Sequence, residues 1–299
     1  MWLLLAFISA ILLGLYEVFK KVSLEGNAVI PVILVSISFS CLILSPFLII
    51  SDFYPNLLKG SIFFVPYVDF HTHLLFILKA VIVLTSWIFA YFALKHLPIS
   101  LASPIKATQP VWTVVGAMLI FGEKLNGYQA AGVGLTLVSF FMFSVIGKKE
   151  GISFKTNKWF WFIVMATLTG AVSGLYDKYL LKKFDPMSVQ VYYTFYQAII
   201  MGIITLFLWA PSRKKTTPFK FKWAIAFISL FLVTADFVYF YALTLPDSMI
   251  SVVSTIRRSG VIVPFIYGAI VLHDKNIKLK IIDLIGVLVG MLLLYFGSK

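Results

Sequence analysis

Long runs of apolar residues recur along the chain, in place of the one-sided apolar stripes that are typical of helices in soluble proteins. A run of about 20 apolar residues is long enough to cross the hydrocarbon core of a bilayer. Such runs predict ten membrane-spanning helices, near residues 2–20, 29–51, 73–94, 99–121, 127–147, 158–181, 187–210, 222–244, 248–272 and 280–297. Proline or clustered charge separates them, as in APSRKKTTPFKFK at residues 210–222. The pattern predicts an all-α polytopic membrane protein.

Composition supports this fold class. Hydrophobic residues make up 61% of the 299 positions and charged residues only 12%, whereas soluble domains carry roughly 25% charged residues. The N-terminal stretch MWLLLAFISAILLGLYEVFKK has neither the basic start nor the small-residue cleavage site of a secretion signal, so we expect it to be the first retained span. We expect a multi-pass protein in the lipid bilayer of the cytoplasmic (inner) membrane.

The two halves of the chain resemble each other. GLYE at residues 14–17 matches GLYD at residues 174–177, and TSWIFAYFALKHLP at residues 85–98 matches TADFVYFYALTLP at residues 234–246. Each half holds five predicted spans, an odd number, so the second copy enters the membrane from the opposite side. This predicts two inverted five-helix repeats, residues 1–147 and 158–299, joined by a linker at residues 148–157. Inverted repeats typically place a substrate site at their interface near mid-depth.

Four basic residues fall inside predicted spans and away from the first and last few positions: Lys79, Lys106, Arg257 and Arg258. A charge at the bilayer centre costs between about 3 and 10 kcal/mol, depending on the method, so each needs water, a counter-ion or an anionic ligand. Lys79 is close enough to a span end for its ammonium to reach the interface. Lys106 falls opposite Arg257 when the repeats are aligned. We therefore expect the cations of the fourth and ninth spans to meet in a pocket between the halves.

Three of the acidic residues within spans are candidates for the site: Glu17, Asp177 and Asp236. Asp236 is near mid-depth in the eighth span, and an ion pair with the arginines is the alternative to an anionic ligand. Glu17 precedes two lysines at positions 20 and 21, which favours a salt bridge within its own helix, and its repeat mate Asp177 has the same interpretation. A carboxylate in a medium of low dielectric favours its protonated form, so Asp236, Glu17 and Asp177 are also candidates for coupling proton or ion movement to transport.

Aromatic, hydroxyl and amide side chains near the cations complete the candidate substrate site: Trp87, Tyr91, Tyr239, Thr108 and Gln109. Aromatic residues make up 17% of the chain, so packing in the core or against lipid is the alternative for each ring. Pro104 and Pro110 in the fourth span and Pro264 in the ninth can kink these helices and free backbone groups toward a cavity.

Catalytic and nucleotide-binding motifs are absent from the sequence. It has no G-x-S-x-G, Walker A or H-E-x-x-H pattern, and His71 and His73 alone do not make a metal site, so we expect no enzyme activity, cofactor or metal. The net charge of +13 does not indicate nucleic acid, because most basic residues lie in short loops between apolar runs.

The architecture and the segment FGEKLNGYQAAGVGL at residues 121–135 resemble the EamA-like branch of the drug/metabolite transporter superfamily. The second repeat has His273-Asp274-Lys275 where the resemblance implies a Gly-Glu-basic turn. Lys106 and the Arg257–Arg258 pair are similar in type and span to the phosphate-binding lysine and Lys-Arg pair of plastid sugar-phosphate translocators. This similarity implies that an anionic solute holds the cations, and arginine suits two-pronged contacts with phosphate or carboxylate.

The resemblance implies a secondary carrier that moves a small anionic or zwitterionic metabolite by alternating access, as a monomer or homodimer, with H⁺ or a counter-substrate as the coupling partner. An exporter of amino acids or amphipathic drugs is an alternative. A membrane-embedded lipid-modifying enzyme or a non-transporting assembly partner is an alternative of another class.

Orientation stays open at this point. The loops after odd-numbered spans carry more than twice as many Lys and Arg residues as the remaining loops and the C-terminus. The positive-inside rule therefore places both termini outside, whereas the resemblance implies cytoplasmic termini.

Overall fold

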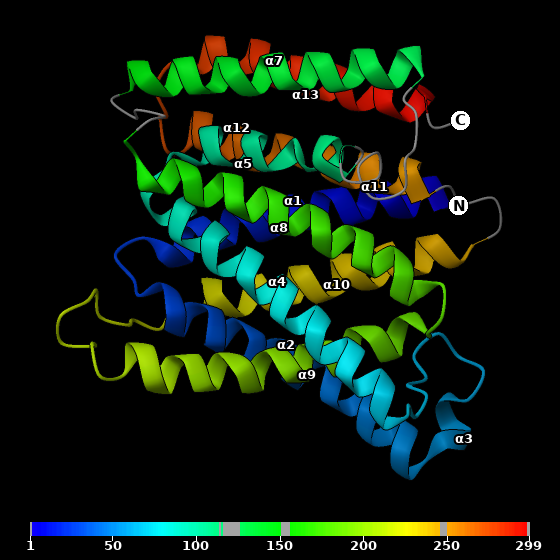
Figure 1. The fold of residues 1–299 in the computed structure, drawn as a ribbon. Coiled ribbons are helices and arrows are strands. Elements are labelled where there is room, and N and C mark those ends of the chain that lie inside the picture. The colour runs from blue at the N-terminus through cyan, green and yellow to red at the C-terminus, as the bar shows by residue number, and fades with distance from the viewer. Residues whose placement is uncertain (1, 114, 116–125, 151–155, 246–249, 298–299) are drawn as a thin grey trace.

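The computed structural model describes residues 2–113, 115, 126–150, 156–245 and 250–297. Its helices are α1 (Trp2–Leu24), α2 (Val29–Phe53), α3 (Pro55–Leu58), α4 (Phe70–His96), α5 (Ile99–Ala107), α7 (Gly127–Lys149), α8 (Lys158–Leu181), α9 (Pro186–Ile204) with the π-helical turn η1 (Thr205–Trp209), α10 (Ala224–Thr244), α11 (Ile250–Ser259), α12 (Ile262–Ile270) and α13 (Ile277–Gly297). Their axes run roughly parallel or antiparallel across the bundle (Figure 1). The prediction of an all-helical membrane protein is confirmed.

Eight helices in the described ranges are long and apolar enough to cross a membrane. They match eight of the ten predicted spans. The fourth and ninth predicted spans contain shorter pieces instead: α5 followed by a helical stretch at residues 109–113, and α11 followed by α12. The count of ten stays a prediction, since residues 116–125, which include the Gly-Glu-Lys turn at 122–124, lie outside the described residues.

Helix pairing follows the symmetry expected of an inverted repeat. The first span packs on the eighth (α1 on α10), and the sixth packs on the third (α8 on α4), which is the same pairing with the halves exchanged. Three further pairs join equivalent spans: α2 with α9, α5 with α12, and α7 with α13. The pairs α4 with α9 and α10 with α2 are again one contact with the halves exchanged. Figure 1 shows α7 and α13 at one edge of the bundle and α2 and α9 at the opposite edge. Helices from both repeats therefore surround the centre.

Small residues let the broken spans approach α1 and α8 closely at equivalent positions. A Cβ added to Gly14 would lie 2.6 Å from the carbonyl oxygen of Gly260, which itself packs against the backbone of Ala10. The repeat mates of Ala10 and Gly14 are Gly170 and Gly174, and the carbonyl of Gly170 accepts a hydrogen bond from Gln109 Nε2 at 2.6 Å. Pairs of small residues four positions apart permit such close helix crossings, so both breaks are seated on the opposite repeat.

The ends of the odd-numbered spans gather at one face, and both termini lie on the other side (Figure 1). At the first of these faces a polar network joins the repeats. Asp274 accepts hydrogen bonds from the amide of Ser100 at 3.0 Å and from its hydroxyl at 2.5 Å. Lys280 is completely buried, and its Nζ donates to Ser100 Oγ at 3.0 Å and lies 2.8 Å from Glu150 Oε1. These contacts hold α5, α7 and α13 together at that face.

The pairing of α7 with α13 depends on glycine. A Cβ added to Gly132 would lie 2.7 Å from the carbonyl oxygen of Gly290 and 2.9 Å from the amide nitrogen of Leu294, both of them backbone atoms. Gly134, two residues along the same helix, has nothing within 4 Å of its added Cβ. The two glycines therefore form a matched pair for testing this contact.

We predict that Gly132→Ala lowers the free energy of unfolding by about 1–3 kcal/mol, the usual cost of overpacking a well-packed interface. Gly134→Ala should be neutral or slightly stabilising, because alanine is the better helix former by about 1 kcal/mol. Thermal unfolding of the purified protein in detergent, followed by the loss of its monodisperse chromatographic peak, measures both. Equal stability of the two variants would contradict the packing described.

Candidate functional site

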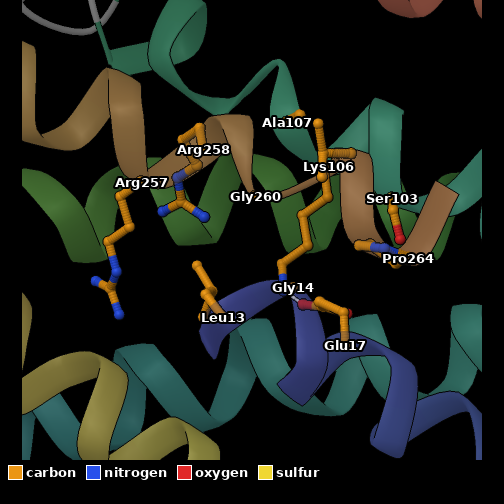
Figure 2. A pocket seen from close by; sticks show the side chains of 11 residues that line it. Leu13, Gly14, Glu17, Ser103, Lys106, Ala107, Arg257, Arg258, Gly260 and Pro264 are labelled. Atoms are coloured by element: carbon orange, nitrogen blue, oxygen red, sulfur yellow. Dashed lines mark hydrogen bonds and ion pairs between the residues drawn. The ribbon is translucent and has the colours of Figure 1, made fainter. Parts of the chain in front are cut away.

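A cavity lies where α1, α5, α11 and α12 meet (Figure 2). We call it the first cavity. Four of its lining residues are charged: Glu17 from α1, Lys106 from α5, and Arg257 and Arg258 from α11. The structure thus brings the three cations of the fourth and ninth spans to one space between the repeats.

The cations reach this cavity on two short helices of matching length. Lys106 stands seven residues after the first residue of α5, and Arg257 stands seven residues after the first residue of α11. At a rise of 1.5 Å per residue, each lies about 10 Å along its helix axis. Because α5 and α11 begin at opposite faces of the bundle, the two side chains approach the middle of the membrane from opposite sides.

Both spans are interrupted directly after the cations. Pro110 has no N–H to donate to the carbonyl of Lys106. The amide of Thr108 donates to the carbonyl of Ile105, three residues earlier, at 3.1 Å. In the ninth span, the amide of Gly260 donates to the carbonyl of Arg257, three residues earlier, at 3.4 Å. Pro264 has no N–H to donate to the carbonyl of Gly260. The last carbonyls of α5 and α11 form the negative ends of their helix dipoles, which stabilise the cations beside them.

Glu17 is the counter-ion for two lysines. Its Oε1 accepts a hydrogen bond from Lys106 Nζ at 2.5 Å, and its Oε2 lies 2.6 Å from Lys20 Nζ. Lys20 is 1% exposed, and its ammonium lies 4.6 Å from the ring centre of Tyr16 and 4.9 Å from that of Tyr91. One carboxylate and two aromatic faces therefore hold two positive charges.

Arg257 forms an ion pair with Asp236 of α10. The guanidinium lies 4.3 Å from the ring centre of Tyr239, a cation–π distance, and the hydroxyl of Tyr193 on α9 donates to Asp236 Oδ2 at 3.3 Å. This ion pair is the alternative that the sequence raised for the arginines. It neutralises one of them and links α9, α10 and α11.

Arg258 differs from its neighbour. In the described part of the chain, no carboxylate lies within ion-pair distance of its guanidinium, which Figure 2 shows pointing into the space between Arg257 and Lys106. The polar centre of the bundle holds five cations and three carboxylates, a net charge of +2 with all groups ionised: Lys20, Lys79, Lys106, Arg257 and Arg258 against Glu17, Asp177 and Asp236. The site is electropositive.

A second cavity lies between spans two, three, seven and eight. Asp236 lines it, together with Trp87, Gln190, Tyr193 and Gln197. The two residues of the Asp236–Arg257 pair therefore line different cavities, Arg257 the first and Asp236 the second.

Comparison with known proteins gives the family. The profile of the EamA-like transporter family matches in two segments, residues 1–145 and 157–296. The chain belongs to the EamA-like transporter family. It is therefore a multi-pass membrane transporter of the drug/metabolite transporter superfamily, as the sequence resemblance implied. No curated protein matches it. A crystal structure of another protein is 14% identical with a TM-score of 0.63, covering 99% of this chain and 98% of the other, which shows a shared fold alone.

The prediction for Lys79 is wrong in this EamA-like transporter. Its ammonium does not reach the interface: the side chain is 3% exposed, forms an ion pair with Asp177 of α8, and lies 4.5 Å from the ring centre of Tyr193. The expected partner of Asp177 was a lysine on its own helix, whereas the actual one comes from α4. The pair joins the third span to the sixth and so links the two repeats. The position of Lys79 relative to the end of its span does not predict this partner.

The predicted partners of Glu17 are half right. Lys20 pairs with it, but Lys21 donates to the carbonyls of Leu94 and Leu97, at 2.7 and 2.8 Å, and so anchors α1 to the end of α4. Lys106 takes the remaining carboxylate oxygen. The salt bridge is also buried, not interfacial, since the side chain of Glu17 is 13% exposed.

The other candidate substrate-binding residues do not line the first cavity. Thr108 bonds to a carbonyl of its own helix, Gln109 bonds to α8, and Tyr91 is fully buried under Lys20. Trp87 lines the second cavity, and Tyr239 covers the guanidinium of Arg257. These side chains build the surroundings of the cations, and a direct role in binding stays a prediction.

Two residues of the site were missed by sequence reasoning. Ser103 lines the first cavity and Tyr193 bonds to Asp236, yet a serine and a tyrosine inside apolar spans give no pattern that singles them out.

We predict that Lys79→Met destabilises the protein by about 3 kcal/mol, because it leaves the Asp177 carboxylate inside the bundle without its cation. The double variant Lys79→Met/Asp177→Leu should lose less, since no charge is then left unpaired. Thermal unfolding in detergent gives both values, with Lys59→Met, an exposed loop position, as the control. A double variant less stable than Lys79→Met would show that the pair is not the stabilising contact.

Proposed function

We propose that this transporter is a secondary carrier for a small anionic or zwitterionic metabolite bearing phosphate or carboxylate, in the cytoplasmic membrane. The observation that carries the proposal is the excess of hydrogen-bond donors over acceptors in the first cavity. A phosphate or carboxylate group supplies the missing acceptors and the missing negative charge together.

The spare donors lie on both sides of the cavity. The hydroxyl of Ser103 and the Nε of Arg257 are buried without a hydrogen-bond partner in the described chain, and both residues line the first cavity. Arg258 adds a guanidinium without a carboxylate partner. Buried donors left unsatisfied cost about 1–3 kcal/mol each, more when charged. An oxyanion seated beside the Arg258 guanidinium would supply acceptors for it, and guanidinium groups are suited to bind an oxyanion in a two-pronged manner.

The first cavity favours an anion over an amphipathic drug. None of the residues that line it is aromatic, whereas a carrier of amphipathic drugs needs apolar ring surfaces on its substrate. Glu17 is the one carboxylate in the lining. It already holds two lysines, so an ammonium group on the substrate would have to compete with them. The cargo is therefore an anion, or a zwitterion bound mainly through its acidic group.

The position of the cavity supports alternating access as the transport mechanism. The cavity is bounded by two interrupted spans from opposite repeats, the arrangement in which one repeat rocks against the other around a central site. At the face formed by the ends of the odd-numbered spans, Ser100, Asp274, Lys280 and Glu150 bind the repeats together. Opening toward that face requires these contacts to separate. The sequence contains no Walker A loop, so an ion or solute gradient is the energy source.

We predict that Arg258→Gln weakens binding of the cargo by at least tenfold, which corresponds to about 1.4 kcal/mol and is within the range of one charge-assisted hydrogen bond. Phosphorylated and carboxylated metabolites are first screened for stabilisation of the purified protein against heat. The best ligand is then measured by direct binding and by flux into liposomes.

Lys183→Gln is the matched control, because Lys183 is an exposed lysine at the end of α8, away from both cavities. It should leave binding and flux unchanged. If no anion in the screen stabilises the wild-type protein, or if both variants behave alike, the anion proposal fails. Product formation without flux would indicate an enzyme instead.

A further inference from the structure

We propose that the Asp236–Arg257 ion pair couples anion binding to proton uptake, because its two partners line two different cavities. An anion bound in the first cavity takes over Arg257 as its own partner. A proton that arrives through the second cavity then replaces Arg257 on Asp236. The inference rests on the proposed function of the first cavity and adds the coupling ion and its route.

The two cavities share no lining residue, and the ion pair lies between them. Arg257 lines only the first cavity, where Arg258 and Lys106 are its neighbours. Asp236 lines only the second cavity, where its neighbours are Tyr193 and Gln190. A ligand in one cavity therefore competes for one partner of the pair without touching the other partner.

An unsatisfied amide lines the second cavity together with Asp236. Gln197 lines this cavity, is 1% exposed, and its Nε2 has no hydrogen-bond partner within the described residues. The amide of Gln190, by contrast, is satisfied, because its Nε2 donates to the carbonyl of Val233 at 3.0 Å. Buried polar groups without a protein partner are normally satisfied by ordered water. Water that accepts from Gln197 is in the same cavity as the carboxylate, so it can deliver a proton there.

The groups around Asp236 define what happens when Arg257 leaves. Arg257 is the cation paired with it in the described chain, and the Tyr193 hydroxyl is its other polar contact, at 3.3 Å. Lys79 lies over the Tyr193 ring, but its ammonium is already paired with Asp177. Without Arg257, the carboxylate keeps a single neutral hydrogen bond in a medium of low dielectric, where the protonated form is favoured.

The coupling is reciprocal. An anion that withdraws Arg257 favours protonation of Asp236, and protonation of Asp236 releases Arg257 for the anion, by the same factor in both directions. The bound state then holds one added negative charge and one added proton, so the net charge of the centre changes little when a monovalent group binds. The geometry thus favours anion–proton symport.

The first test measures binding of inorganic sulfate to the purified protein at several pH values. Sulfate serves as the probe because it is an oxyanion whose own charge does not change between about pH 5 and pH 8, so any dependence belongs to the protein. In the wild type, affinity should rise as pH falls, by up to about tenfold per pH unit, the limit for one coupled proton.

Asp236→Asn imitates the protonated state, so it should bind sulfate tightly and independently of pH. Asp236→Glu retains a titratable group and should keep the pH dependence, which guards against a folding defect in the asparagine variant. A pH dependence that survives in Asp236→Asn, or is missing in the wild type while sulfate still binds, overturns the coupling proposal. Sulfate binding that is absent at every pH and in every variant overturns the proposed function itself.

The second test addresses the route. Gln197→Leu removes the polar group from the lining of the second cavity, so uptake of sulfate driven by a proton gradient into liposomes should be lost, while sulfate–sulfate exchange without net proton movement is retained. Thr205→Val is the control: this threonine is buried on the same span, bonds only to its own helix and does not line the cavity. Equal loss of both transport modes in Gln197→Leu would show that the second cavity does not supply the proton.

Discussion

The cost of placing positive charge inside a bilayer governs the centre of this protein. Each buried cation would cost several kcal/mol without a partner, and the structure meets that cost with carboxylates, aromatic rings and helix ends. Glu17 holds Lys20 and Lys106, Asp236 holds Arg257, and Asp177 holds Lys79. The compensation is incomplete at Arg258, and we propose that an anionic substrate makes up this deficit.

Inverted duplication explains why the deficit lies between the repeats. The fourth and ninth spans break after equivalent positions, so their last carbonyls and their cations converge from opposite faces. Close crossings at Gly14 and Gly170 seat each broken span on a helix of the other repeat. The charges themselves are not symmetric: Glu17 pairs with the fourth span, whereas its mate Asp177 pairs with the third. This asymmetry leaves Arg257 to Asp236 and separates the two cavities.

The fold was largely predictable from the sequence, because apolar run length and the repeat are physical constraints that act locally or by symmetry. The meeting of Lys106 with Arg257 and Arg258 followed from the same symmetry. Side-chain partners were harder to predict. The partner of Lys79 depends on which helix lies opposite it, and the positions of the span boundaries do not give that information. The roles of Ser103, Gln197 and Tyr193 could not be predicted. The sequence does not show whether a lone polar residue in an apolar span bonds to its own helix or lines a cavity.

The most direct measurement is a crystal structure of the protein soaked in selenate, whose anomalous scattering locates an oxyanion without prior assumptions. A peak in the first cavity beside Arg258, with a selenate oxygen within about 3 Å of its guanidinium, is the expected result. A map with no peak there, and with Arg258 sealed against apolar side chains or paired with a carboxylate, would contradict the claim that the centre binds an anion.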